Sequence, residues 1–388
     1  MAVRTAQRKS AQLETAQPDS AQPESAKAAD GRHTTAPVHR PTLLGLLLRG
    51  AVYAALAYFV LVFLSRNEDI AGRATDAVVF AIIGLSLHIL IGYTGQLSLG
   101  HQGFQGVGAF TAAYVSFEKG VPFVLAIAIA MLVGALFALL LGFIALRITG
   151  LYLALITLVF GITLKDSLFE LESITGGGAG AEAVRPEVLQ SNVRYYFLCL
   201  AILTVVLYID WRLTRTKAGR ALLALRENER VASAFGINVT AFKLFAFVLS
   251  GALAGLAGAL FVYRFGATSS GDYEFNDALT FVLMVVVGGL GSRVGVVLGS
   301  VLFSALGLRY LLDYEPIKEF LSGIFAERSQ FIPDAIGAFL LLTTLIFNPG
   351  GIAQQLQPIT RWLGGKKFTL HGDHDSGPAV VEGSSARA

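Results

Sequence analysis

Residues 121–146 read VPFVLAIAIAMLVGALFALLLGFIAL, a continuous apolar stretch without a charged side chain. A helix that crosses a bilayer needs about 20 such residues, because the hydrocarbon core is about 30 Å thick and each residue rises about 1.5 Å. The rest of the chain has a similar bias, since 54% of its 388 residues are hydrophobic and only 15% are charged. Soluble domains contain about 25% charged residues. The sequence therefore predicts an all-α, polytopic transmembrane helical bundle.

Further apolar runs on both sides of this stretch are long enough, or nearly long enough, to span a membrane. Those at 278–291 and 331–347 are short, and the former could pair with the next run as a re-entrant hairpin. We expect about ten spanning helices, at 43–64, 76–94, 101–117, 121–146, 150–168, 193–210, 242–265, 278–291, 294–312 and 331–347.

The two ends of the chain differ in composition from this apolar core. Residues 1–40 are rich in Ala, Gln, Ser, Thr and Pro and contain no apolar run, which is typical of a disordered segment. The last residues are polar and rich in Gly and Ser. The predicted organisation is a disordered cytoplasmic tail at 1–40, a transmembrane permease-like domain at 41–350 and a polar cytoplasmic tail at 351–388.

The distribution of basic residues predicts the orientation in the membrane. With ten spans and a cytoplasmic N-terminus, the cytoplasmic segments hold two-thirds of the 30 Lys and Arg residues. Cytoplasmic loops carry such an excess, whereas acidic residues contribute little to orientation. We therefore expect both termini in the cytoplasm and a multi-pass protein of the inner (plasma) cell membrane. The same excess accounts for the net charge of +3 without a nucleic-acid partner.

The segment 211–241, WRLTRTKAGRALLALRENERVASAFGINVTA, lies between two strong membrane runs. It combines basic residues with apolar side chains at helical spacing, followed by a glycine that can end the helix. A solvated loop would explain the charges but has no need of an apolar stripe. A cytoplasmic helix with such a face lies on membrane lipid or docks into a partner's groove. The residues singled out on this basis are Arg220, Leu222, Leu225, Arg226, Glu229, Ala232, Phe235 and Gly236.

Small residues recur on one face of the run 242–265. Gly251, Ala254, Gly255 and Gly258 fall at positions i, i+3, i+4 and i+7, which leaves a groove along the helix. Two helix backbones can approach closely at such a groove. Glycine is also frequent in membrane helices without a packing role, so loose apolar filler is the alternative interpretation.

A second group of glycines lies between residues 92 and 108, too densely spaced for a regular helix. Irregular backbone at membrane depth occurs where it is buried in protein or lines a cavity. We interpret this stretch as a broken helix near the transport pathway, although an ordinary cytoplasmic turn would have the same composition. The candidate pathway residues are Gly92, Gly95, Gly100, His101 and His88.

Ionisable residues within the runs are few: Arg49 and the two histidines, with Lys165 and Asp166 near a run's end. Intramembrane charges are candidates for function by default, but a neutral histidine or a snorkelling arginine needs no such role. The apolar runs show no conspicuous acids. This favours a transporter that takes its energy from a partner over a self-contained, ion-coupled carrier.

Enzyme chemistry has no support in the sequence. The Gly-x₄-Gly-Lys-Ser/Thr phosphate loop is absent, since the nearest match, at 364–367, lacks the hydroxyl after lysine. Cys199 is the single cysteine, which excludes an intrachain disulfide and a cysteine-based metal site. We therefore expect no catalytic, cofactor or metal site, and the chain cannot power transport by itself.

Three blocks of the sequence resemble a known family. The run at 219–261, from GRALLALRENERVASAFGIN onward, resembles the cytoplasmic coupling loop and following helix of permease subunits of branched-chain amino acid ABC importers. The run GYTGQLSLGHQGFQGVGAFTAAYV at 92–115 resembles the signature of the longer of their two permeases, and VVVGGLGSRVGVVLGS at 285–300 resembles a third block. One departure is that Arg230-Val231-Ala232 stand where importer loops carry Glu-Ala-Ala, with Glu229 as the nearest acid.

The resemblance implies partners and a cargo. The partners are cytoplasmic ATP-binding subunits, a second homologous permease subunit and an extracytoplasmic substrate-binding protein, and the cargo is a branched-chain or other hydrophobic amino acid. Permeases for urea and short-chain amides are closely similar and are an alternative. A self-contained secondary carrier or channel is the alternative from another class. The basic loop at 211–241, read as an ATPase-coupling loop, favours the importer.

Overall fold

The computed structural model describes residues 43–145, 148, 150–175, 180–304, 306–307, 332–347 and 350–363. The expected tail at 1–40 and the residues from 364 onward lie outside this part of the chain. The described residues are mostly helical, as the apolar runs predict, and those from Leu47 onward belong to one unit.

The α-helices are α1 (Leu43–Tyr58), α2 (Glu68–Thr94), α3 (His101–Ala113), α4 (Phe123–Ala145), α5 (Leu151–Thr163), α6 (Glu172–Thr175), α7 (Asn192–Arg215), α8 (Lys217–Glu227), α9 (Glu229–Ala234), α10 (Val239–Phe265), α11 (Phe275–Gly288), α12 (Arg293–Phe303), α15 (Ile332–Phe347) and α16 (Gly351–Leu363). One-turn π-helices extend α1, α3 and α5, at η1 (Phe59–Phe63), η2 (Tyr114–Glu118) and η3 (Leu164–Leu168). Two short 3₁₀ turns are η5 (Glu187–Leu189) and η6 (Ser270–Asp272). The strands β1 (Ala181–Glu182) and β2 (Ala267–Thr268) pair antiparallel, with Ala181 opposite Thr268.

Five helical segments within the described residues are long and apolar enough to cross a membrane: Glu68–Thr94, Phe123–Ile144, Leu151–Leu168, Asn192–Arg215 and Val239–Phe265. Three shorter apolar helices accompany them, at Ala51–Phe63, Arg293–Phe303 and Ala335–Thr344. The expected spans at 278–291 and 294–312 instead begin as the short helices α11 and α12, because the turn at Gly289, with φ of 118°, separates them.

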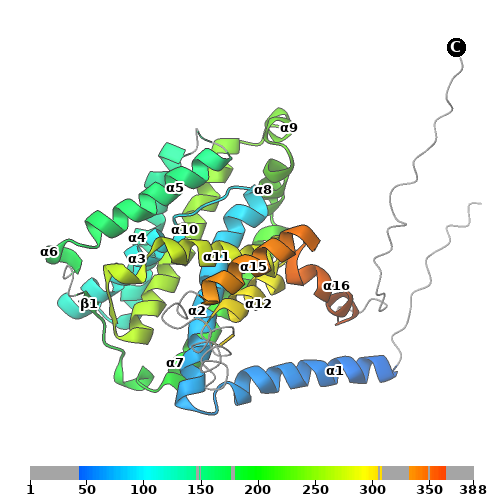
Figure 1. Cartoon of the computed structure of the whole chain (residues 1–388), viewed down its shortest axis with the longest axis horizontal. Helices are drawn as coiled ribbons and strands as arrows, with labels where there is room; N and C mark the ends of the chain where they lie inside the picture. The colour runs from blue at the N-terminus through cyan, green and yellow to red at the C-terminus, as the bar shows by residue number, and fades with distance from the viewer. Residues whose placement is uncertain are drawn as a thin grey trace, which may run out of the picture. The chain divides into compact units, whose positions relative to one another are not determined.

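Helices α2 and α10 form the buried core of the bundle, and α3, α4, α7, α11 and α12 pack around them (Figure 1). The apolar window of α2 is 94% buried, whereas those of α4, α5 and α7 are each 28% buried. The outer helices expose apolar side chains such as Leu132 and Leu155. Such surfaces are stable against lipid or a neighbouring membrane subunit, not against water.

The glycines of α10 lie where α10 meets α4 and α3. A Cβ atom on Gly255 would lie 2.7 Å from the carbonyl oxygen of Ala130 and 3.3 Å from the Cα atom of Gly134, both on α4. Gly258 faces the backbone of α3 at Gln105 in the same way, and Ala254 is fully buried. Gly251 likewise faces Gly134. The backbones are therefore in direct contact along this face of α10.

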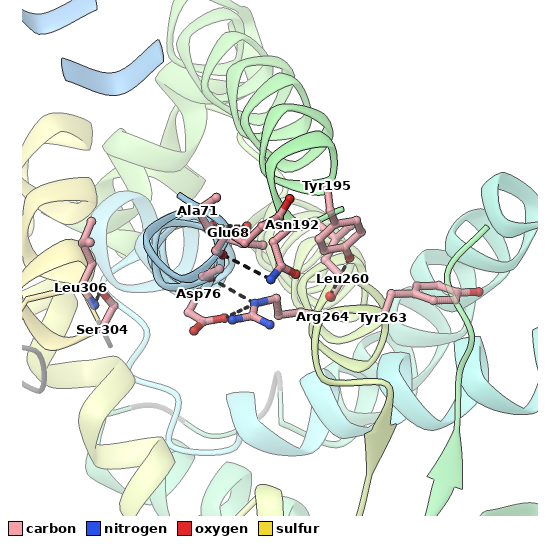
Figure 2. A network of polar contacts seen from close by, with 12 residues as sticks. Glu68, Ala71, Asp76, Asn192, Tyr195, Leu260, Tyr263, Arg264, Ser304 and Leu306 are labelled. Carbon is pink, nitrogen blue, oxygen red and sulfur yellow. Dashed lines mark hydrogen bonds and ion pairs between the residues drawn. The ribbon is translucent and has the colours of Figure 1, made fainter. Parts of the chain in front are cut away.

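Polar contacts join α2, α7 and α10 at the end where α10 terminates, which we call the cavity end (Figure 2). Arg264 extends from α10 to Asp76 on α2, with 3.0 Å between its Nε and a carboxylate oxygen, and also donates to the carbonyl of Gly72. Glu68 accepts a hydrogen bond of 2.6 Å from the backbone N–H of Asn192. An acid at that position also stabilises the N-terminus of α7.

A break separates α2 from α3 within the predicted broken-helix region. Gly95 ends α2 in the left-handed conformation, with φ of 70°, and α3 starts at His101. The connecting backbone is packed inside the protein, since the N–H of Leu99 donates to Thr157 on α5. Burial against protein satisfies the requirement for irregular backbone at membrane depth.

Residues 351–363 differ from the sequence-based expectation, because they form helix α16 instead of the start of a polar tail. Ala353 on α16 is 9% exposed and packs close to Gly289 and Gly295 of the α11–α12 hairpin. The segment is amphipathic, with Ile352 and Leu356 on one side, and is too short to register as an apolar run of spanning length.

The backbone contact of α10 generates the first prediction. Replacing Gly255 with leucine forces α4 away from α10, and overpacking of this kind costs about 1–3 kcal/mol. Thermal unfolding of the purified chain in detergent should therefore shift to lower temperature in Gly255→Leu. The control is Ala128→Leu, which adds the same side chain at an exposed position of α4. Equal melting of Gly255→Leu and wild type would mean that this contact does not hold the bundle together.

Candidate functional site

A cavity of about 370 Å³ opens at the cavity end of the bundle. Its size lies in the range of small-molecule sites. Helices α2, α3, α10 and α11 and the segment between α10 and α11 contribute its walls. The lining residues are Asp76, Phe80, Gln105, Phe261, Phe265, Ala267, Gly271, Asp272, Asp277 and Phe281.

The three carboxylates of the cavity are held in place by local contacts. Asp272 accepts a hydrogen bond of 2.7 Å from the backbone N–H of Ser269 and so fixes the turn after α10. Asp277 accepts one of 2.9 Å from the backbone N–H of Glu274, in a capping box that starts α11. Asp76 is paired with Arg264. Each of these carboxylates is therefore fixed in position by a backbone N–H or by an arginine.

The remaining walls are aromatic, with one neutral amide. Phe80 and Phe281 meet edge to face, with ring centroids 5.9 Å apart, and Phe261 contributes a third ring. Gln105 is 5% exposed and lines the cavity, so its amide contributes the polar part of this wall.

Tyr273 stands behind the cavity and fixes the turn that carries Asp272. Its hydroxyl lies 2.6 Å from that of Thr268 in β2, and its ring contacts Phe110, Phe169 and Phe261. Burial raises the pKa of the Tyr273 phenol above its usual value, so the group stays neutral at physiological pH. The loop is thereby anchored by a neutral hydrogen bond.

The opposite end of α10 carries the segment predicted to couple to ATPase subunits. Thr216 accepts a hydrogen bond from the N–H of Gly219 and starts α8, and Asn228 ends α8 and caps α9 through hydrogen bonds from Arg230 and Val231. Gly236 follows α9 with φ of 81°. The chain then enters α10 at Asn238, whose side chain caps that helix.

The single apolar stripe expected along this segment does not form, because Asn228 divides it into two helices. Leu222, Leu225 and Ala232 are buried within the chain itself, at 0%, 2% and 3% exposure, and α8 packs against α2, α7 and α10. Phe235 is instead 83% exposed, with Val231 beside it at 51%. The surface open to a partner is therefore the tip formed by α9, not the stripe on α8.

Two predicted residues anchor this tip to the membrane helices. The guanidinium of Arg226 donates a hydrogen bond of 2.7 Å to the carbonyl of Gly92, near the end of α2. Glu229 forms an ion pair of 2.6 Å with Lys243, a buried residue near the start of α10. Arg220 stays exposed and donates to the carbonyl of Arg215. Glu229 stands next to Arg230, the position where importer loops carry a glutamate. Its carboxylate is thus already paired with a lysine of this chain.

Sequence reasoning missed the charged residues at the edges of the runs. Asp210 on α7 accepts hydrogen bonds of 2.9 Å from Tyr93 and forms an ion pair with Arg293, which starts α12. Asp76 and Arg264 form the pair at the cavity end. These acids contradict the expectation that the helices lack them. Each stands at the first or last position of an apolar run, where a residue is easily assigned to headgroups instead of the interior.

None of the candidate pathway residues lines the cavity of about 370 Å³. His101 is buried and bonded to Ser98 at 3.0 Å and Ser250 at 2.8 Å. His88 is buried against the ring of Tyr93. Gly92, Gly95 and Gly100 lie at close contacts with His88, Arg226 and Thr157 respectively. These residues thus contact neighbouring helices, and their role in a pathway stays a prediction, whereas the cavity lies farther along α2 and α10.

No group of His, Cys, Asp or Glu side chains in the described ranges has the arrangement of a metal site. The three carboxylates at the cavity mouth do not form one either. The cavity combines an aromatic wall with carboxylates and a side-chain amide. Such a surface can hold a small organic molecule that carries both an apolar part and a hydrogen-bonding or cationic group.

Comparison with known proteins identifies the family. Residues 69–326 match the family described as branched-chain amino acid transport system / permease component. The chain is 33% identical to the high-affinity branched-chain amino acid transport system permease protein LivM of Escherichia coli, and 31% identical to that of Salmonella typhimurium. Each alignment of 313 residues covers 74% of this chain and 70% of the relative.

More distant relatives carry other names. The ribose import permease protein RbsC of Haemophilus influenzae is 28% identical over 62% of this chain and 73% of its own. No solved structure matches the chain. The match to the family model extends from the start of α2 past α12 and so includes both the cavity and the α8–α9 tip. The chain therefore belongs to the family of branched-chain amino acid transport system permease components.

Proposed function

We propose that this chain is a membrane-spanning permease subunit of an ABC importer for branched-chain or other hydrophobic amino acids. It forms the translocation path with a second, homologous permease, receives cargo from an extracytoplasmic substrate-binding protein and is driven by cytoplasmic ATP-binding subunits. The cargo follows from the LivM relatives, which are named for branched-chain amino acid transport. The apolar faces exposed on α4 and α5 are suited to lipid and to a second permease.

The observation that carries this proposal is the position of two surfaces at opposite ends of one helix. The cavity includes Phe261 and Phe265 at the end of α10, and the α9 tip lies directly before its start. Helix α10 has 27 residues, which at about 1.5 Å each separates the two by about 40 Å. A cargo site on one side of a bilayer and a partner surface on the other is the arrangement that an ATP-driven importer requires.

The helix contacts also support a cytoplasmic C-terminal tail, which we propose together with ten spans and a cytoplasmic N-terminus. Arg293, the first residue of α12, pairs with Asp210 near the end of α7, from which α8 follows. Gly351, at the start of α16, packs on Gly289 in the turn between α11 and α12. The chain after α15 thus lies at the end of the bundle that carries α8 and α9. If the coupling tip is cytoplasmic, the C-terminal tail is cytoplasmic as well. The protein itself then lies in the inner (plasma) membrane.

The buried acids do not favour a self-contained carrier. Asp76 and Asp210 each pair with an arginine, so both charges are balanced inside the protein. Acids that move protons or ions in carriers must change partner or protonation state during transport. The pairs therefore serve to hold helices together.

Coupling through the α9 tip gives the second prediction. Phe235→Asp replaces an exposed apolar contact by a charge that an apolar ATPase groove would have to desolvate. Leucine uptake and substrate-stimulated ATP hydrolysis by the assembled importer should fall together by at least tenfold, while membrane insertion and yield stay normal. The control Val188→Asp changes a residue that is 70% exposed outside the tip. Normal coupling in Phe235→Asp would exclude this surface as the contact.

Orientation gives the third prediction. In a chain with Cys199→Ser, single cysteines are introduced by Val188→Cys, between β1 and α7, and by Ser376→Cys, in the C-terminal tail. A membrane-impermeant thiol reagent added to intact cells should modify position 188 and spare position 376 until the membrane is opened. The reverse pattern would overturn the orientation. Modification of both positions from outside would contradict an even number of spans.

A further inference from the structure

A buried side-chain amide lies where α3 packs against α5. Gln102, the second residue of α3, is 1% exposed. Neither its amide oxygen nor its amide nitrogen has a hydrogen-bond partner among the residues that the structure describes. Buried polar groups in proteins are almost always paired, because an unpaired one loses its bonds to water without compensation. The amide of Gln102 therefore calls for a partner that this arrangement of the helices does not supply.

The polar side chains beside Gln102 are, by contrast, bonded to one another. The ring of His101 lies 3.0 Å from the hydroxyl of Ser98 and 2.8 Å from that of Ser250 on α10. Ser250 also bonds the backbone carbonyl of Ser86 on α2, at 2.9 Å. These bonds fix α2, α3 and α10 to one another inside the bundle. Gln102 thus stands on a rigid base, and α5 is the neighbour that can change its surroundings.

Helix α5 covers the amide of Gln102 with a glycine. A Cβ atom on Gly161 of α5 would lie 2.6 Å from the amide nitrogen of Gln102, and one on Gly103 would lie 3.0 Å from the Cα atom of Gly161. Thr157, one turn earlier on α5, accepts a hydrogen bond from the backbone N–H of Leu99. The cover over the amide is therefore backbone, and a small displacement of α5 uncovers it.

The position and the ends of α5 suit it to such a movement. Its apolar window is 28% buried, against 94% for that of α2. It begins after Gly150, which has φ of 69°, and ends in the one-turn π-helix Leu164–Leu168. Hinges lie at a few residues at the ends of elements, and π-helical turns are frequent at functional sites. Helix α5 can therefore tilt at its ends while α2 and α10 stay packed.

We infer that α5 is a movable cover over the transport path and that Gln102 lines this path when α5 withdraws from α3. The amide then hydrogen-bonds water or the polar groups of a molecule in transit, which satisfies it in the open state. The inference deepens the proposed function and rests on it for the ATP-driven step. It places the path beside Gly100 and His101, two of the candidate pathway residues.

Opposite changes in stability and transport test the role of the amide. Gln102→Met keeps the length of the side chain and removes the amide, so it should melt about 2 °C above wild type in detergent. The assembled importer should nevertheless take up leucine about tenfold more slowly, because the open path loses a hydrogen bond. The control Ser250→Ala removes a hydroxyl that is bonded in the structure and should melt below wild type.

A thiol at position 102 tests the movement of α5. Gln102→Cys is made in a chain with Cys199→Ser, and the control is wild type, whose one cysteine, Cys199, is buried on α7. The measurement is the rate of modification by a permanently charged methanethiosulfonate. During ATP hydrolysis with a leucine-loaded binding protein, position 102 should react about tenfold faster than without nucleotide, because opening exposes it. Cys199 should react at the same low rate in both conditions.

Four results would overturn the inference: melting of Gln102→Met at or below the wild-type temperature, normal leucine uptake in that variant, a rate at position 102 that ATP does not change, or equal acceleration at Cys199. The melting comparison needs no transport and so tests the unpaired amide by itself. ATP-driven leucine uptake by wild type separates the two proposals. Uptake without exposure of position 102 contradicts the movable cover alone, whereas loss of ATP-driven uptake in wild type itself contradicts the proposed function.

Discussion

Direct contact between the backbones of α10, α4 and α3 is the constraint on which the rest of the molecule depends. In a bilayer there is no water to drive apolar helices together, so association relies on close packing and on internal hydrogen bonds. Gly251, Gly255 and Gly258 allow α4 and α3 to approach α10 on adjoining faces. Helix α10 is therefore held along most of its length, and its two ends are positioned relative to each other.

Charged pairs at the two ends complete this frame. Arg264 and Asp76 join α10 to α2 at the cavity, and Lys243 and Glu229 join α10 to the α9 tip at the other end. Asp210 and Arg293 bring α7 and α12 together beside that tip. A buried pair of this kind adds little net stability, but loss of one partner leaves an uncompensated charge. The three pairs therefore connect the tip to α10, α10 to α2, and α7 to α12.

The sequence predicts some of these features because their physical signals are local. Uncharged apolar runs indicate helices, small residues at helical spacing indicate a packing face, and Gly236 after α9 indicates a turn of positive φ. Other features depend on contacts between distant residues. The burial of Leu225, the pairing of Asp76 with Arg264 and the cavity around Gln105 arise only when α2, α3, α8 and α10 meet. No spacing within a single segment encodes them.

This chain is proposed to work as one permease within an ATP-driven complex. The most direct test of this role is to measure the protein composition and the activity of the complex that a tagged, full-length chain forms in mild detergent. It should retain ATP-binding subunits and a second permease of the same family, and ATP hydrolysis should rise when a leucine-loaded binding protein is added. Isolation as a lone chain that carries leucine into vesicles on an ion gradient would contradict the account.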